Sequence, residues 1–332
     1  MDQRYLNLSC YGKLPCWREY LSVNVGGPAA GAFREWMHSG RGVWLADDTG
    51  VGAEGEGTSG VSRTEQRDMR FLFAPPGSSE LLVGFLRPSR DKGGRRFPFA
   101  TFVQVKLREF GRRSALLPLA VVPAWDALEE MNRSFAEFTQ DSQFHDAAES
   151  SSVPAPEAAS LTRTRYRELT AGSTSHLFDG ASSAFPNQVV ESLGRLAEKA
   201  ADGNMGKGVR MELPVSDDLG AAALDMTFWI DMVNHRFSWQ RLVPSIFLDA
   251  TPGVRGRRAL FIHGEPVAKD YALVFGDAAD RQHLPRPAQP PAPPKLPDAA
   301  ATVGKDAVSH PSYAQLLDKA GAHRPRFLAF LD

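Results

Sequence analysis

One short block of this chain combines turn-forming residues, alternating charges and the start of an aromatic strand. It covers residues 88–99 and reads Pro-Ser-Arg-Asp-Lys-Gly-Gly-Arg-Arg-Phe-Pro-Phe. Apolar segments lie on both sides, over residues 81–86 and 97–107. Proline and serine tend to end a strand, and the paired glycines permit a positive φ. The block therefore predicts a hairpin with a charged tip.

The spacing of apolar residues predicts the remaining elements. Strands are expected at 6–11, 69–74, 81–86 and 97–107, with helices at 28–37, ending near Gly40, and at 117–138, starting near Pro123. A second set is expected as a helix at 186–201, strand 208–213, helix 219–233, strands 245–249 and 259–263, and a short helix at 267–275. We predict an α/β (α+β) fold with mixed, mostly antiparallel sheets flanked by helices.

Composition divides the chain into segments. A glycine-rich stretch at 49–60 predicts an exposed loop, and a stretch rich in Ala, Ser, Thr and Pro predicts a connection between two α/β halves. A run of prolines further on predicts an extended spacer. The predicted division is an N-terminal half at 1–145, a connecting segment at 146–183, a second α/β half at 184–283, the spacer at 284–297 and a short tail at 298–332.

Charge and cysteine content exclude several classes of protein. The 332 residues carry 38 Lys and Arg against 39 Asp and Glu, so the formal net charge of −1 supplies no overall field for nucleic acid or anionic membrane. Cys10 and Cys16 have neither a metal-binding nor a disulfide-framework spacing, which fits a reducing compartment. We expect a cytoplasmic protein that binds no nucleic acid and is not inserted in a membrane.

The sequence contains no recognisable catalytic motif. The string at residues 50–55 matches G-x-G-x-x-G, but it lacks the strand-to-helix context of a dinucleotide site and predicts a loop instead. There is no G-x-S-x-G nucleophile elbow and no H-E-x-x-H zinc pair. We therefore expect a binding or scaffold protein without catalytic residues, metal or cofactor.

The charged tip has two interpretations. Asp91, Arg95 and Arg96 either present guanidinium groups to a partner, or Asp91 pairs internally with Arg95 and fixes the hairpin. Lys13 also has two interpretations: its side chain either contacts a partner or caps a backbone carbonyl. Trp17 and Tyr20 also have two interpretations. Aromatic residues are enriched at binding interfaces, so the two side chains could anchor a partner, but most aromatic residues lie in protein cores.

Three blocks of the sequence resemble the TagF (ImpM) family of bacterial type VI secretion accessory proteins. The charged tip fits a Pro-Ser-x-Asp-x-x-Gly-Arg-x-Phe-Pro pattern through Pro88, Ser89, Asp91, Gly94, Arg95, Phe97 and Pro98. An upstream block fits Gly-Lys-Leu-Pro through Gly12, Lys13, Leu14 and Pro15. Residues 244–247 are similar to a Pro-Ser-Leu-Phe strand of longer members. The chain departs from the family at 16–20, where members have Gly-Asp-Phe.

The resemblance implies a function that the residues alone do not. It implies a longin-like N-terminal half and a post-translational negative regulator of type VI secretion that binds and sequesters the forkhead-associated protein Fha. An alternative is a structural adaptor that assembles or positions the secretion apparatus. The candidate partner-binding residues are Lys13, Trp17, Tyr20, Asp91, Arg95 and Arg96.

Overall fold

The structure is a computed structural model that describes residues 4–48, 67–110, 114–169, 177, 208–237, 243–276, 284, 312, 315 and 316. The predicted loop at 49–60 and the predicted helix at 186–201 lie outside these residues. The predicted spacer, apart from Leu284, also lies outside them, and so does nearly all of the predicted tail.

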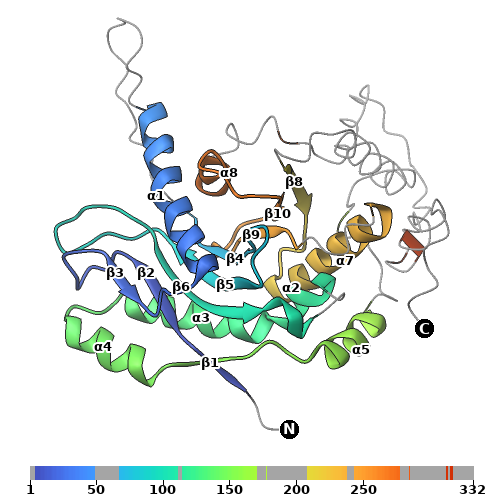
Figure 1. The fold of residues 1–332 in the computed structure, drawn as a ribbon, viewed down its shortest axis with the longest axis horizontal. Helices are drawn as coiled ribbons and strands as arrows, with labels where there is room; N and C mark the ends of the chain where they lie inside the picture. Colours follow the sequence, from blue (N-terminus) through green and yellow to red (C-terminus); the bar gives the residue numbers. More distant parts are fainter. Residues whose placement is uncertain are drawn as a thin grey trace, which may run out of the picture.

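The centre of the described structure is an eight-stranded sheet with the order β3-β2-β6-β5-β4-β9-β10-β8 (Figure 1). Every pairing between these described strands is antiparallel. The strands are β2 Ser9–Gly12, β3 Leu21–Val23, β4 Met69–Phe73, β5 Glu80–Arg87, β6 Phe99–Lys106, β8 Val209–Pro214, β9 Ser245–Asp249 and β10 Arg258–His263. The α/β fold with a mostly antiparallel sheet is therefore confirmed.

The strands of both predicted halves belong to this one sheet. β4, β5 and β6 form the predicted meander, and β9 pairs with the free edge of β4, placing Phe71 opposite Phe247. The side chain of Ser245 in β9 also accepts a hydrogen bond from the backbone N–H of Ala74, at 2.9 Å. The boundaries between the halves stay a prediction, but their strands are continuous in space.

Helices cover both faces of the sheet, and the alternation of side chains along each strand explains why (Figure 1). In β4, Phe71 and Phe73 pack with α1 and α8, whereas Leu72 faces the cluster that contains α3 and α7. The whole of β4 is buried, as expected for a strand between two helical layers. The helices are α1 Pro28–Asp48, α2 Leu117–Ala120, α3 Val122–Phe135, α4 Asp141–Ser150, α5 Ala159–Leu169, α7 Leu219–Phe237 and α8 Asp270–Phe275.

The described part of the predicted connecting segment is packed against the body of the protein. Beyond the end of α4, it forms β7 Ser152–Pro154, which pairs with β1 Tyr5–Asn7 in a separate two-stranded sheet, and then α5. Val153 is fully buried, and the hydroxyl of Tyr166 donates to Asp231 in α7 at 3.1 Å. Composition predicted only a connecting segment here because the sparse apolar residues that anchor it do not form a long periodic pattern.

Two differences between the predicted and the observed helix boundaries are the largest. The predicted helix over 117–138 is divided at Val121 into α2 and α3, with Pro123 in the first turn of α3 as expected. The helix that was predicted to end near Gly40 continues to Asp48. At Gly40 the backbone lies so close to α8 that an added Cβ would be 2.6 Å from the Cβ of Tyr271. Tertiary packing therefore carries α1 through a residue that usually weakens helices.

The two glycines near the middle of α1 provide a matched test of this packing. Gly40→Ala should lower the free energy of unfolding by about 1–3 kcal/mol, because the new methyl group clashes with Tyr271 despite the better helix propensity of alanine. Gly42→Ala, where an added Cβ meets nothing within 4 Å, should raise it by about 0.5–1 kcal/mol. Urea unfolding followed by circular dichroism measures both changes. Equal effects of the two substitutions would contradict the close approach of α1 and α8.

Candidate functional site

The two segments that carry the predicted motifs lie against each other at one end of the sheet. Residues 12–20 join β2 to β3, and residues 88–98 join β5 to β6; we call these two segments together the motif cluster. The backbone N–H of Lys92 donates to the carbonyl of Trp17 at 2.8 Å, and the Arg95 guanidinium donates to the carbonyl of Arg18. The contact is closest at Gly12, where φ is +129° and an added Cβ would lie 2.0 Å from the carbonyl oxygen of Pro98.

Asp91 lies at the centre of the motif cluster. Its carboxylate is fully buried, and its Oδ2 accepts from Lys13 Nζ at 2.8 Å and from Arg95 Nε at 2.7 Å. Its Oδ1 accepts from the backbone N–H groups of Gly93 and Arg95, both at 2.9 Å. Burial raises the pKa of Asp91, but the hydrogen bonds from Lys13 and Arg95 outweigh it and hold the pKa well below its usual range. The carboxylate is therefore ionised, and both of its oxygens accept hydrogen bonds from within the protein.

The predicted hairpin with a charged tip is present. The backbone N–H of Asp91 donates to the carbonyl of Arg95 at 3.0 Å, and Gly94 adopts the positive φ of +81° that the turn requires. Residues Arg90 and Arg96 form an antiparallel bridge below the tip. Of the two interpretations of Asp91 and Arg95, the internal pair is the one observed.

The candidate residues differ in what they offer to a partner. Lys13 and Asp91 are buried, so they position the residues of the surface and do not form part of it. The side chain of Arg95 remains 58% exposed even though it pairs with Asp91, and Arg96 is exposed beside it. Trp17 is half-buried, and its ring packs edge-on against His145 of α4, with centroids 5.4 Å apart. A role for these residues in partner binding stays a prediction.

Tyr20 connects the motif cluster to helix α1. Its ring lies 4.7 Å from Lys13 Nζ and 4.9 Å from the ring of Phe97, and the residue is 42% exposed. On the other side its ring is 5.0 Å from His38 of α1. Tyr20, predicted as an anchor from its residue type, therefore lies where the two motifs and a helix meet.

No sequence pattern indicated the partners of Tyr20 on the α1 side. His38 and Tyr11 form a hydrogen bond between Nε2 and the phenol hydroxyl. Burial lowers the pKa of His38, and the positive charges of Arg34 and Arg41 lower it further. Burial raises the pKa of Tyr11 to about 12. A neutral imidazole and a protonated phenol fit one hydrogen bond, in which the hydroxyl donates.

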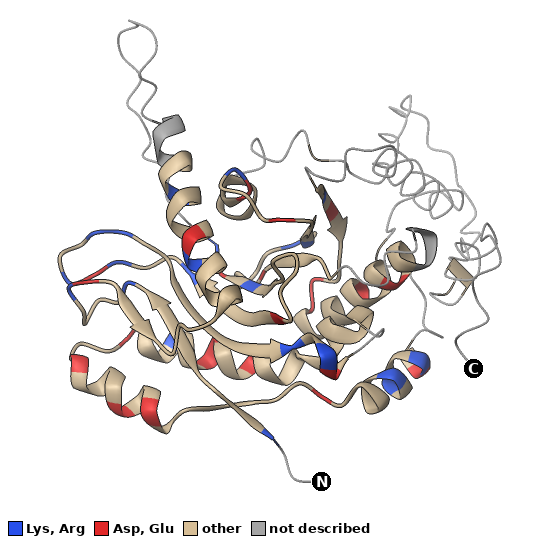
Figure 2. Ribbon diagram, viewed as in Figure 1, with Lys and Arg blue, Asp and Glu red and all other residues tan. Residues whose placement is uncertain are grey.

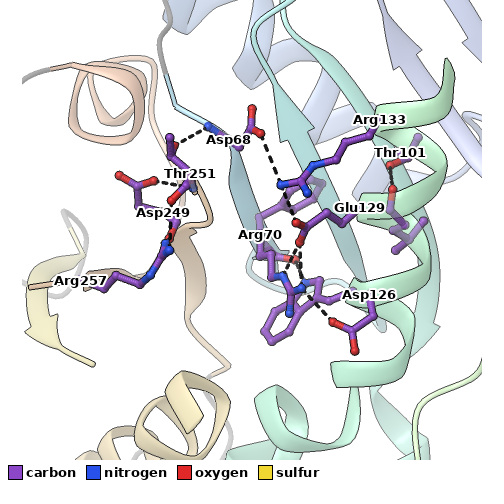
Figure 3. A network of polar contacts seen from close by, with 12 residues as sticks. Asp68, Arg70, Thr101, Asp126, Glu129, Arg133, Asp249, Thr251 and Arg257 are labelled. Atoms are coloured by element: carbon purple, nitrogen blue, oxygen red, sulfur yellow. Dashed lines mark hydrogen bonds and ion pairs between the residues drawn. The ribbon is translucent and has the colours of Figure 1, made fainter. Parts of the chain in front are cut away.

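A second polar network, shown in Figure 3, was also missed by the sequence reasoning. Arg70 of β4 is buried and donates to Glu129 and Asp126 of α3, each at 2.8 Å. Glu129 also pairs with Arg133 at 2.7 Å. This network fixes α3 on the sheet. A sequence pattern could not reveal it, because a single arginine in an apolar strand does not identify its distant partners.

Nearby contacts hold the turn after β9. The backbone N–H of Asp68 donates to Thr251 Oγ1 at 3.0 Å, and Arg257 donates to the carbonyl of Thr251 at 3.0 Å.

Within the described part of the chain, no group of three or more His, Cys, Asp and Glu residues could hold a metal ion. Nor does any helix among the described residues have the length and apolar character needed to cross a membrane.

The fold and the motif cluster together define an α/β protein with an exposed, internally braced hairpin. Residues 9–150, which contain both motif segments, match the family model described as "TagF N-terminal domain, Type VI secretion system-associated". The N-terminal region of the chain is therefore identified as a TagF N-terminal domain, a domain associated with type VI secretion.

Other comparisons add little. A search of curated proteins found no match. A solved structure, the crystal structure of PA0076 from Pseudomonas aeruginosa PAO1, matches with 20% identity and a TM-score of 0.34. The match covers 45% of this chain and 64% of that one, so the chain spans less than two thirds of that protein's length. A likeness at this TM-score carries no argument about fold or function.

Replacing only one partner of the buried pair of Lys13 and Asp91 is expected to destabilise the fold strongly. Asp91→Asn should lower the free energy of unfolding by about 3–5 kcal/mol, because Lys13 is left as a buried charge without its counter-ion. Adding Lys13→Met should restore about 1–3 kcal/mol. The control is Asp126→Asn, whose side chain is 61% exposed and whose loss should cost less than about 1 kcal/mol. Chemical denaturation of these proteins and of the Lys13→Met single variant measures these differences, and additive effects at residues 13 and 91 would contradict the pairing.

The same carboxylate predicts how stability depends on pH. The folded pKa of Asp91 is lowered, so its contribution is present above the unfolded pKa of about 4 and is lost as the pH falls through the folded value. Between about pH 4 and pH 2 the unmodified protein should lose stability more steeply than the Lys13→Met/Asp91→Asn double variant, by up to about 1.4 kcal/mol per pH unit. Denaturation curves at several pH values test this, and parallel curves would show that Asp91 is not held ionised in the fold.

Proposed function

We propose that this chain is a non-enzymatic, cytoplasmic accessory protein of the type VI secretion system. In this proposal it is a post-translational negative regulator that binds and sequesters the forkhead-associated protein Fha. The proposal rests chiefly on one observation: the two family motifs form a single surface, braced by the buried contact of Lys13 with Asp91.

The geometry of the motif cluster supports binding more than catalysis. The oxygens of Asp91 accept hydrogen bonds from Lys13, Gly93 and Arg95, so this carboxylate is poorly suited to exchange protons with a substrate. Outside this buried pair, the hairpin exposes Arg95 and Arg96, and Tyr20 is partly exposed close by. Arginine and tyrosine on a rigid support are typical of binding hot spots.

The first test measures the affinity of the purified chain for Fha by calorimetry. Arg96→Glu and Tyr20→Ala should each weaken binding about tenfold or more, a loss of about 1.4 kcal/mol or more, because they remove exposed charge and aromatic area from a braced surface. Arg165→Glu, on the exposed side of α5, makes the same change in net charge as Arg96→Glu and should leave the affinity unchanged. Circular dichroism establishes that each variant is folded.

The outcome also separates regulation from the alternative of a structural adaptor. Absence of binding by the intact chain would overturn sequestration. If a variant without residues 284–332 still binds Fha but no longer supports assembly of the secretion apparatus in cells, the adaptor function is favoured. Repression of secretion by the truncated chain would instead place the regulatory activity in the remaining residues.

A further inference from the structure

A basic surface extends from the motif cluster onto helix α1. Arg34 and Arg41 of α1 both act electrostatically on His38, whose ring contacts Tyr20. The guanidinium carbon of Arg41 lies 5.9 Å from the centroid of Phe97, the residue that follows Arg96 in the hairpin. The helix and the hairpin are therefore neighbours, although the sequence between Arg41 and Phe97 includes two strands of the sheet.

Exposed positive charge gathers around Tyr20. Figure 2 shows basic residues along the loop that joins β5 to β6 and on the part of α1 near it. We call this surface the basic face; it consists of Tyr20 with the exposed residues Arg18, Arg34, Arg90, Arg95 and Arg96. Apart from Arg95, the charged side chains of this set form no ion pair or hydrogen bond with any residue that the structure describes.

Acidic residues near the basic face are fewer than its basic residues. Glu19 pairs with Arg95 at 3.3 Å and is 74% exposed. Glu35 is exposed on α1, and Asp141 of α4 acts on the thiol of Cys16 below the loop. The chain as a whole has a formal net charge of −1, so the positive charge is a local property of this surface and not of the protein.

We infer that the basic face docks an acidic, carboxylate-rich segment of a protein partner, with the ring of Tyr20 as its apolar contact. The inference deepens the proposed function and rests on it only in taking the partner to be a protein. Guanidinium groups suit carboxylates because they can donate two parallel hydrogen bonds. The Tyr20 ring is supported by Phe97 and His38, so it loses little freedom on binding.

The arrangement fits a protein segment better than a nucleic acid. Glu19, Glu35 and Asp141 would repel a continuous phosphate backbone, whereas a peptide with spaced carboxylates can avoid them. A single partly exposed tyrosine also offers no series of aromatic platforms for stacked bases. Exposed ion pairs each contribute modestly, so several must act together and the binding must weaken with salt.

The experiment uses the full chain and a fluorescein-labelled oligoglutamate peptide as probe, with oligolysine, oligophosphoserine and a DNA oligonucleotide of similar length for comparison. We expect fluorescence anisotropy to show oligoglutamate as the preferred probe. Arg34→Glu should weaken its binding about twofold to fivefold, and Glu19→Gln should strengthen it by up to about fivefold, because it removes a negative charge and releases Arg95. Arg165→Glu on α5 should have no effect. Thermal unfolding verifies the fold of each variant.

Several results would overturn the inference. Equal weakening by Arg34→Glu and Arg165→Glu would show that only the net charge matters. Preferred binding of oligophosphoserine or of DNA would reject the carboxylate assignment. The same variants measured against Fha keep the two proposals apart. If Fha binds the intact chain and Arg34→Glu equally well, the regulator proposal stands and the basic face is not its docking site. If Fha does not bind while the peptide results hold, the basic face stands and the proposed partner fails.

Discussion

The arrangement of the motif cluster depends on the ionised carboxylate of Asp91. One buried group collects Lys13 from the first motif, Arg95 from its own hairpin and two backbone N–H groups of the tip. Desolvating such a group is expensive, so its net contribution to stability is smaller than its hydrogen bonds imply. What the contact provides is a defined geometry, since an arrangement that separated the two segments would leave a buried lysine and a buried aspartate unpaired.

The aromatic core explains why α1 stands beside this cluster. Phe33 stacks on Phe71 with centroids 4.9 Å apart, and Trp36 stacks on Phe247 of β9 at 5.2 Å. These contacts fix the rotation of the helix about its axis. Because residues four apart lie on the same side of a helix, the same rotation places Arg34 and His38 together near the motif cluster. The packing of the core thus determines which charges surround Tyr20.

Features encoded by neighbouring residues were predictable from the sequence. The hairpin at 88–98, the meander of β4, β5 and β6 and the proline at the start of α3 all depend on turn chemistry or short periodic patterns. Features that depend on contacts between distant residues could not be predicted from the sequence. The continuation of α1 through Gly40 requires Tyr271, and the burial of Arg70 requires α3. In the candidate site, the pair of Asp91 and Arg95 could be anticipated, whereas the contact of Tyr20 with His38 could not, because it joins residues from separate elements.

The pairing of β4 with β9 bears on what a fragment of this chain would do. The region that matches the family model ends at residue 150, whereas β9 begins at Ser245. A protein cut to the matched region would keep β4 but lose the strand that satisfies its outer backbone groups over Met69–Leu72 and that stacks Phe247 on Trp36. Such an edge is apolar and unpaired, and strands of this kind recruit other copies of themselves. The matched region therefore supplies only part of the sheet, and expressed alone we expect it to form aggregates.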